Sequence, residues 1–160
     1  MTQGGLPVTA PDPGPILAAR NIIFRHHGAG APLFEGLNLA IRPGEFLVII
    51  GPNGSGKTTL LKVLSGVYAP QGGEVILKTR PIRAIPPRER ARSVAVVFQE
   101  ARILFDFTVL EVALMGRAPH LGAWRLERTA DFESARAALR EMDLARQEDA
   151  HLEELSSGER

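Results

Sequence analysis

Residues 51–58, GPNGSGKT, combine the residue types that hold a chain of phosphate groups. They fit the pattern G-x-x-x-x-G-K-[ST], in which glycine lets backbone N–H groups approach phosphate oxygens closely. Lys57 supplies a positive charge for the terminal phosphates, and Thr58 supplies a hydroxyl for Mg²⁺. The residues that we expect to bind phosphate or Mg²⁺ here are Gly51, Pro52, Asn53, Gly54, Ser55, Gly56, Lys57, Thr58 and Thr59.

A phosphate loop needs a strand before it and a helix after it. The apolar run FLVII predicts a buried strand over 46–50, and TLLKVLSG predicts a helix over 58–66. The N-terminus of such a helix directs its positive end toward the same anion. The apolar face of the helix would consist of Leu60, Val63, Leu64 and Val67. A glycine-rich turn with a surface lysine is the alternative, and these flanking elements disfavour it.

The remaining chain alternates short apolar runs with glycine and proline, a pattern typical of strands and turns. ILAARNIIF, LNLAI and GGEVIL predict strands over 16–24, 37–41 and 72–77, and SVAVVFQ predicts a buried strand over 93–99. FTVLEVALMGR predicts a helix that ends at Gly116. A later amphipathic helix would bury one face, formed by Phe132, Ala135, Leu139 and Met142.

Composition is that of an ordinary soluble globular protein, with 160 residues, 44% hydrophobic, 23% charged and a net charge of +1. The near-neutral charge disfavours nucleic acid as a partner, and we expect the basic stretch 80–92 to be a solvated surface. The chain has no cysteine, which excludes thiolate chemistry. Residues 1–15 are rich in Pro and Gly and predict a disordered lead-in. No run reaches the roughly 20 apolar residues that span a bilayer.

Three motifs resemble one family. GEFLVIIGPNGSGKTTLLKVLSG resembles the Walker A region of ABC-type ATPases, the nucleotide-binding subunits of ABC transporters. VAVVFQE places Gln99 where that family has its Q-loop glutamine, and LSSGE at 155–159 resembles its LSGGQ signature. The resemblance implies an α/β fold, a P-loop NTPase (ABC ATPase) core with an antiparallel β subdomain and a helical subdomain. A partial ABC ATPase domain would cover 16–160, with the helical and signature subdomain at about 100–155.

The resemblance also implies roles for residues outside the phosphate loop, with ATP and Mg²⁺ as the ligands. The side-chain oxygen of Gln99 would reach Mg²⁺ or the attacking water, so that Thr58 and Gln99 together hold the metal. His26 stands where the family places an aromatic ring against adenine, with Phe24 pointing to the core. The alternative is that His26 and His27 are solvent-facing turn residues, and neither is favoured.

The signature implies a partner, because in this family it contacts the ATP of a second copy. Ser156, Ser157, Gly158 and Glu159 would close over that ATP in a head-to-tail dimer around two ATP molecules. Ser157 replaces the usual glycine and Glu159 the usual glutamine. We expect either change to lower affinity.

The stretch VALMGRAPHLG resembles ATP-binding subunits of importers for iron chelates, haem and cobalamin. That resemblance implies transmembrane permease subunits as partners and a peripheral location on the cytoplasmic face of the plasma (inner) membrane. Arg117 and His120 would face the permease. The alternative is that this segment serves only as a subdomain core, formed by Phe105, Phe107, Leu110 and Leu114.

The family's Walker B aspartate and catalytic glutamate have no counterpart before Arg160, so no catalytic residue is identified. Without a general base, we expect a truncated copy of marginal stability, with unpaired hydrophobic edges and no meaningful turnover. Two alternatives stay open beside the importer subunit. One is a soluble ABC-type ATPase without a membrane partner, and the other is a degenerate nucleotide-binding fragment.

Overall fold

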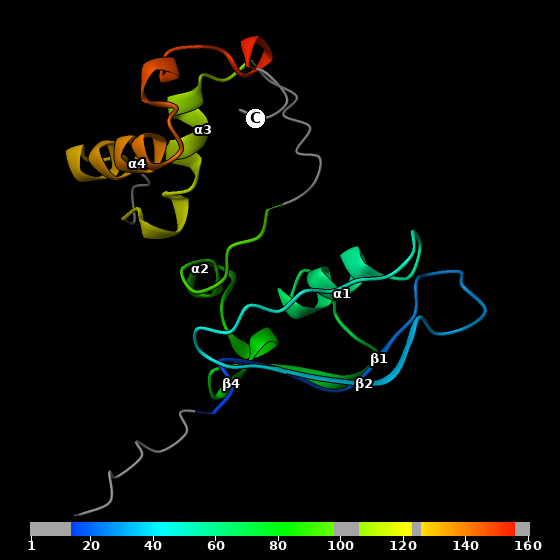
Figure 1. Cartoon of the computed structure of the whole chain (residues 1–160). Coiled ribbons are helices and arrows are strands. Elements are labelled where there is room, and N and C mark those ends of the chain that lie inside the picture. The colour runs from blue at the N-terminus through cyan, green and yellow to red at the C-terminus, as the bar shows by residue number, and fades with distance from the viewer. Residues whose placement is uncertain (1–13, 98–105, 123–125, 156–160) are drawn as a thin grey trace, which may run out of the picture. The chain divides into compact units, whose positions relative to one another are not determined.

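The computed structural model describes residues 14–97, 106–122 and 126–155. The chain divides into two compact units, one up to Pro86 and one from Pro87 onward (Figure 1). The domain boundaries expected from the sequence stay a prediction. No helix among the described residues is long and apolar enough to cross a membrane.

The first unit is built on an antiparallel sheet with the strand order β2-β1-β3-β4. Its strands are β1 (Leu17–Phe24), β2 (Phe34–Ile41), β3 (Gly72–Leu77) and β4 (Arg80–Pro81). The central strand β1 pairs with β2 through Leu17–Ile41 and with β3 through Leu17–Leu77. Three predicted strands are therefore confirmed, because each finds an antiparallel neighbour within this unit.

Helix α1 (Lys57–Leu64) lies over one face of this sheet (Figure 1). It buries Leu60, Val63 and Leu64, as the helical spacing predicts, but leaves Val67 beyond its end and exposed. A short turn of 3₁₀ helix, η1 (Ile82–Ala84), adds the buried Ile82 to the same core. The prediction of a wholly solvated 80–92 is thus wrong at Ile82 and Ile85, whose side chains are buried.

Two strand predictions find no strand among the described residues. Residues 46–50 and the described part of the second stretch, 93–97, have no regular secondary structure. Phe46 is 91% exposed and Val97 is 95% exposed. A strand is stabilised by its ladder of hydrogen bonds, and neither stretch is paired with a strand within 14–97, 106–122 or 126–155. Apolar composition alone therefore did not produce a strand.

The second unit is helical. It contains α2 (Pro87–Ala91), α3 (Val109–Met115), η2 (Ala118–His120), α4 (Thr129–Glu141), η3 (Ala145–Gln147) and η4 (Leu152–Glu154). Thr108 caps α3 with its side chain, which accepts the N–H of Glu111, while the Glu111 carboxylate accepts the N–H of Thr108. Val109, Leu139 and Leu155 form the core of the unit.

The amphipathic prediction for α4 is confirmed at Ala135 and Leu139, which are both buried. It is wrong at Met142, which is 74% exposed because the helix ends at Glu141 and the chain leaves the helical path. Leu144 follows and packs partly against the core of this unit. The helix therefore ends one residue before the last position of the predicted apolar face, and Leu139 is the last buried residue of that face.

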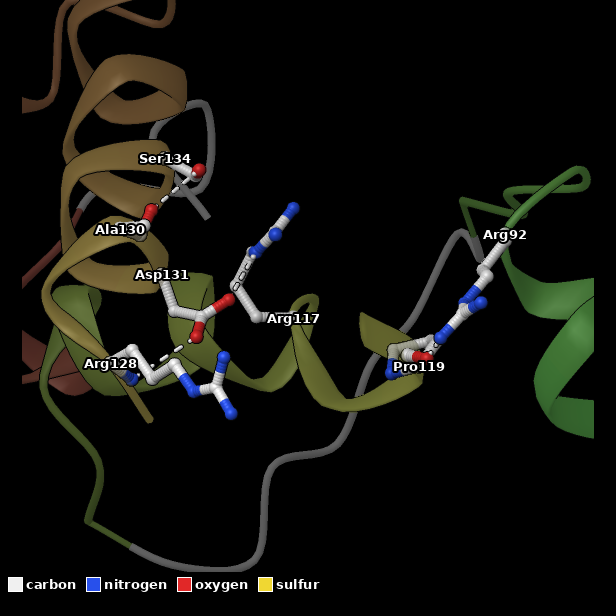
Figure 2. A network of polar contacts seen from close by, with 7 residues as sticks. All are labelled: Arg92, Arg117, Pro119, Arg128, Ala130, Asp131 and Ser134. Atoms are coloured by element: carbon white, nitrogen blue, oxygen red, sulfur yellow. Dashed lines mark hydrogen bonds and ion pairs between the residues drawn. The ribbon is translucent and has the colours of Figure 1, made fainter. Parts of the chain in front are cut away.

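The start of α4 is held by a buried carboxylate (Figure 2). Asp131 accepts the Arg128 N–H at 3.1 Å and the Arg117 Nε–H at 3.1 Å. The bond from the Arg128 backbone, then the bond from Arg117, lower the pKa of Asp131 below its ordinary value. The resemblance implied that Arg117 faces a permease. In the structure its side chain forms a hydrogen bond with Asp131, within the second unit.

Arginines of the basic stretch also make contacts inside the second unit. Arg88 and Arg92 each donate from Nε to the carbonyl oxygen of Pro119, at 3.0 and 2.9 Å (Figure 2 shows the contact of Arg92). These bonds tie α2 and the residue after it to η2. Two arginines of the stretch 80–92 therefore hold η2 in place through hydrogen bonds, and do not only face solvent.

Candidate functional site: the loop at 51–58

The loop ends at α1 in a backbone conformation that glycine provides. Gly54 has φ 81° and Gly56 has φ 93°, both in the left-handed region. A Cβ on Gly56 would lie 2.9 Å from Leu33 Cδ2. Both the dihedral angle and the lack of space therefore require glycine at Gly56.

The N-terminus of α1 is suited to an anion. Gly56 is the N-cap residue, with no side chain that caps the helix, and no acidic residue lies in the first turn. The first N–H groups of an α-helix have no partner within the helix, and the helix dipole is positive at this end. A helix N-terminus of this kind favours an anion, and the motif predicts a phosphate at this position.

Lys57 bends back over the loop. Its ammonium donates to the carbonyl oxygens of Gly51 at 2.7 Å and Pro52 at 2.8 Å. An ammonium has three N–H donors, so these two carbonyls leave one donor for another acceptor. The positive charge of Lys57 therefore lies at this loop. The loop also contains Asn53 and Ser55, which we predict to contact phosphate.

Thr58 and Thr59 follow Lys57 in the first turn of α1 and differ in environment. Thr58 is exposed, so it is accessible to a ligand from solvent. Thr59 is buried, and its Oγ1 lies 3.1 Å from Nε2 of His26. The first unit thus brings a residue predicted to contact adenine together with one predicted to contact phosphate.

His26 lies in a cluster of aromatic rings. Phe24 is buried, as predicted, and stacks on Tyr68 at a centroid distance of 5.7 Å. The His26 ring stands edge-on to Phe24 at 5.1 Å and to Tyr68 at 6.4 Å. His26 and His27 are both exposed, and the contact of His26 with adenine stays a prediction.

Beside His26 is an open hollow of about 420 Å³. Its lining is residues 25–29 with Ile23 and Gln71. Sequence reasoning missed Gln71, because its hydrogen-bond partner lies 46 residues away along the chain. A turn of the type PQGG carries no signal for such a contact.

Part of the predicted site lies outside the described residues. This part includes Gln99 and the signature residues Ser156, Ser157, Gly158 and Glu159. Their roles stay predictions.

Comparison with known proteins gives a consistent picture. A family model described as ABC transporter matches residues 34–160. Hemin import ATP-binding protein HmuV of Myxococcus xanthus (strain DK1622) is 44% identical over 78% of this chain and 46% of that protein. The protein of the same name from Bradyrhizobium diazoefficiens is 42% identical over 90% of this chain and 51% of its own length. The chain thus spans about half the length of the curated relatives it matches.

Solved structures agree on the fold. An ATP-binding cassette of an ABC transporter in its ADP conformation superposes with a TM-score of 0.74 at 29% identity, over 91% of this chain and 60% of that one. A nucleotide-free cassette gives a TM-score of 0.73 at 28% identity, over 89% of this chain and 59% of that one.

Proposed function

This chain belongs to the ABC transporter family, and we propose from that premise that it is the ATP-binding subunit of an importer for hemin or a related iron chelate. Its fold is that of an ABC ATPase, a P-loop NTPase. The observation that carries the proposal is the geometry of the loop at 51–58. Gly56 is the N-cap residue of α1, and the ammonium of Lys57 lies at the loop, where it donates to the Gly51 carbonyl oxygen.

The residues of the loop fit the phosphates of ATP. The backbone N–H groups around Gly54 and Gly56 and the ammonium of Lys57 would hold the phosphates. The Thr58 hydroxyl, with Gln99, would hold Mg²⁺. The left-handed φ values of Gly54 and Gly56 support this assignment, because they are the backbone conformations that the glycines of such a loop provide. Bound Mg-ATP supplies the phosphoanhydride bond whose cleavage is the energy source of this family.

His26 would contact the adenine ring. His26 is one of the residues that line the hollow, and its Nε2 contacts Thr59 in the first turn of α1. The hollow of about 420 Å³ is large enough to admit a purine base. An imidazole offers a smaller stacking surface than the tyrosine usual in the family, so its contribution to affinity would be modest.

Dimerisation and membrane coupling complete the proposal. Ser156, Ser157, Gly158 and Glu159 would contact the ATP of a second copy, in a head-to-tail dimer. The dimer would work with transmembrane permease subunits on the cytoplasmic face of the inner membrane. The support for import comes from the two relatives, each named for hemin import and matched over about half its length.

Nucleotide binding is tested by titrating the purified chain with Mg-ATP in a calorimeter. We expect saturable binding that weakens at least tenfold in Lys57→Ala, because the lysine charge is lost from the loop. Lys62→Ala is the matched control, since Lys62 lies on the same helix but contacts the Tyr68 ring, and its affinity should equal that of wild type. Equal affinity in a folded Lys57→Ala chain would refute the proposed site.

Import is tested in the organism that makes this chain. A strain without its gene should fail to grow when hemin is the iron source and should grow normally on an inorganic iron salt. A gene copy with Lys57→Ala should not restore growth on hemin, whereas the Lys62→Ala copy should. Normal growth on hemin in the deletion strain would contradict the importer role and favour an ABC-type ATPase without a membrane partner.

A further inference from the structure

Gln71 holds the main chain of Arg25 with both ends of its side-chain amide. Its Oε1 accepts the Arg25 N–H at 2.8 Å, and its Nε2 donates to the Arg25 carbonyl oxygen at 3.0 Å. Its own backbone N–H donates to the carbonyl oxygen of Ile23 at 2.9 Å. Three hydrogen bonds thus join Gln71 to Ile23, near the end of β1, and to Arg25, which follows the strand.

These bonds extend the pairing of β1 with β3 past the last backbone pair. The ladder ends with Ile23 opposite Gly72, and β1 itself ends at Phe24. The Gln71 amide then acts toward Arg25 as a peptide group of a neighbouring strand would, with one donor and one acceptor. A primary amide places its donor and acceptor side by side in one plane, as this pair of bonds to one residue needs, and asparagine is shorter by one methylene group.

The residue that follows Arg25 is His26, whose ring is held separately. Its Nε2 lies 3.1 Å from Oγ1 of Thr59 in the first turn of α1. The main chain of the turn is therefore fixed by Gln71, and the imidazole is fixed by Thr59 and by the edge-on contact with Phe24. Gln71 and His26 both border the same hollow.

We propose that Gln71 is a positioning residue for the nucleobase, which holds the turn at 25–29 so that His26 borders the hollow in the orientation that receives the base. This inference rests on the proposed function, because it assigns the hollow to the base of the nucleotide whose phosphates bind at 51–58. Gln71 itself lines the hollow and acts on the base through the turn. The phosphates are not affected, since Lys57 and the glycines of the loop do not depend on the amide of Gln71.

The test compares two ligands on the full chain. Calorimetric titrations with ATP and with inorganic triphosphate, both with Mg²⁺, separate contacts to the base from contacts to phosphate. Gln71→Glu replaces the donor with an acceptor that faces the Arg25 carbonyl, so we expect ATP affinity to fall about threefold to tenfold. Affinity for inorganic triphosphate should stay at the wild-type value. Gln71→Met keeps the length of the side chain but removes both the donor and the acceptor, so it should likewise lower the affinity for ATP and leave the affinity for triphosphate unchanged.

Two controls make the test specific. Glu74→Gln exchanges a carboxylate for an amide on the exposed side of β3 and should leave both affinities unchanged. In a chain that already carries His26→Ala, the change Gln71→Glu should cause no further loss of ATP affinity, because the residue that it positions is gone. An additive loss in this double variant would show that Gln71 acts independently of His26 and would overturn the inference.

Four other results also decide the matter. Wild-type ATP affinity in both folded Gln71 variants would overturn the inference, and so would an equal loss for ATP and triphosphate, which would indicate a general disturbance of the unit. A wild-type chain that binds neither ligand would refute the phosphate site, and this inference with it. Triphosphate binding without tighter binding of ATP would leave the phosphate site standing and refute only the base site.

Discussion

Gly56 shows how one residue type can be required for two physical reasons. Its φ of 93° costs a residue with a Cβ about 1–3 kcal/mol, and that Cβ would lie 2.9 Å from Leu33 Cδ2. The glycine pattern alone predicts the first requirement. The second depends on a side chain 23 positions earlier in the sequence, which no local pattern reveals.

We therefore expect Gly56→Ala to lower the free energy of unfolding by about 1–3 kcal/mol and to weaken ATP binding. Urea denaturation and calorimetric titration measure the two effects. Gly30→Ala is the control, because Gly30 has ordinary φ and no neighbouring atom within 4 Å of the added Cβ. A Gly56→Ala chain as stable as Gly30→Ala would show that the loop adapts to a side chain there.

Asp131 makes stability depend on pH in a predictable direction. Its pKa is held below the ordinary value of 3.8, first by the Arg128 N–H and then by Arg117. A lowered pKa favours the charged form in the folded protein, so the stabilisation is complete well above pH 3.8 and is lost as pH falls through the folded pKa. Asp131→Asn should lower the urea midpoint at neutral pH, and its difference from wild type should shrink below about pH 4.

The neighbouring carboxylate provides the comparison for Asp131. Glu133 is exposed on the same helix, so Glu133→Gln should leave the urea midpoint close to wild type at every pH. A difference between wild type and Asp131→Asn that does not change with pH would mean that the charge of Asp131 is not what holds the start of α4.

Among the elements, α4 stabilises the second unit through the side chains that it buries. Leu139 is buried with Val109 and Leu155, whereas Met142 is exposed beyond the helix end. Leu139→Ala should lower the free energy of unfolding by about 2–5 kcal/mol, since it removes buried methylene groups and leaves a cavity. Met142→Ala should change it by less than about 0.5 kcal/mol. Urea denaturation of both variants checks this contrast, and similar losses would contradict the placement of the helix face.

The success of the sequence predictions differed by element for a physical reason. The antiparallel strands and the helices α1, α3 and α4 were predicted, because their partners or their amphipathic faces lie within the same unit. Residues 46–50 were predicted as a strand and are not one, because a strand depends on a neighbour that sequence composition does not supply. The same limit applies to the site: the motif at 51–58 indicated Lys57, whereas the contact of Gln71 with Arg25 came only from the structure.

At the scale of the molecule, the first unit has an unusual run of exposed apolar side chains. Phe46, Val48 and Ile50 are 91%, 59% and 89% exposed within five consecutive residues. Single exposed apolar residues are ordinary, but a run of this kind creates an apolar surface.

The chain should therefore bind the dye ANS, and Phe46→Ser combined with Ile50→Ser should reduce the fluorescence of the bound dye by about half or more. Met142→Ser, which removes an isolated exposed side chain of the second unit, should change it little. Fluorescence of the dye at equal protein concentration makes the comparison. Equal dye binding by wild type and the double variant would show that 46–50 is covered in solution.

The central claim is that the loop at 51–58 and the start of α1 bind the phosphates of ATP. An NMR titration of the ¹⁵N-labelled chain with Mg-ATP tests it residue by residue, because amide shifts report where a ligand binds. The account predicts saturable shifts at Gly54, Gly56 and Lys57, unchanged amides along α4, and no saturable shift at the loop in Lys57→Ala. Saturable shifts confined to residues outside the first unit, or no saturable shift at millimolar Mg-ATP, would contradict it.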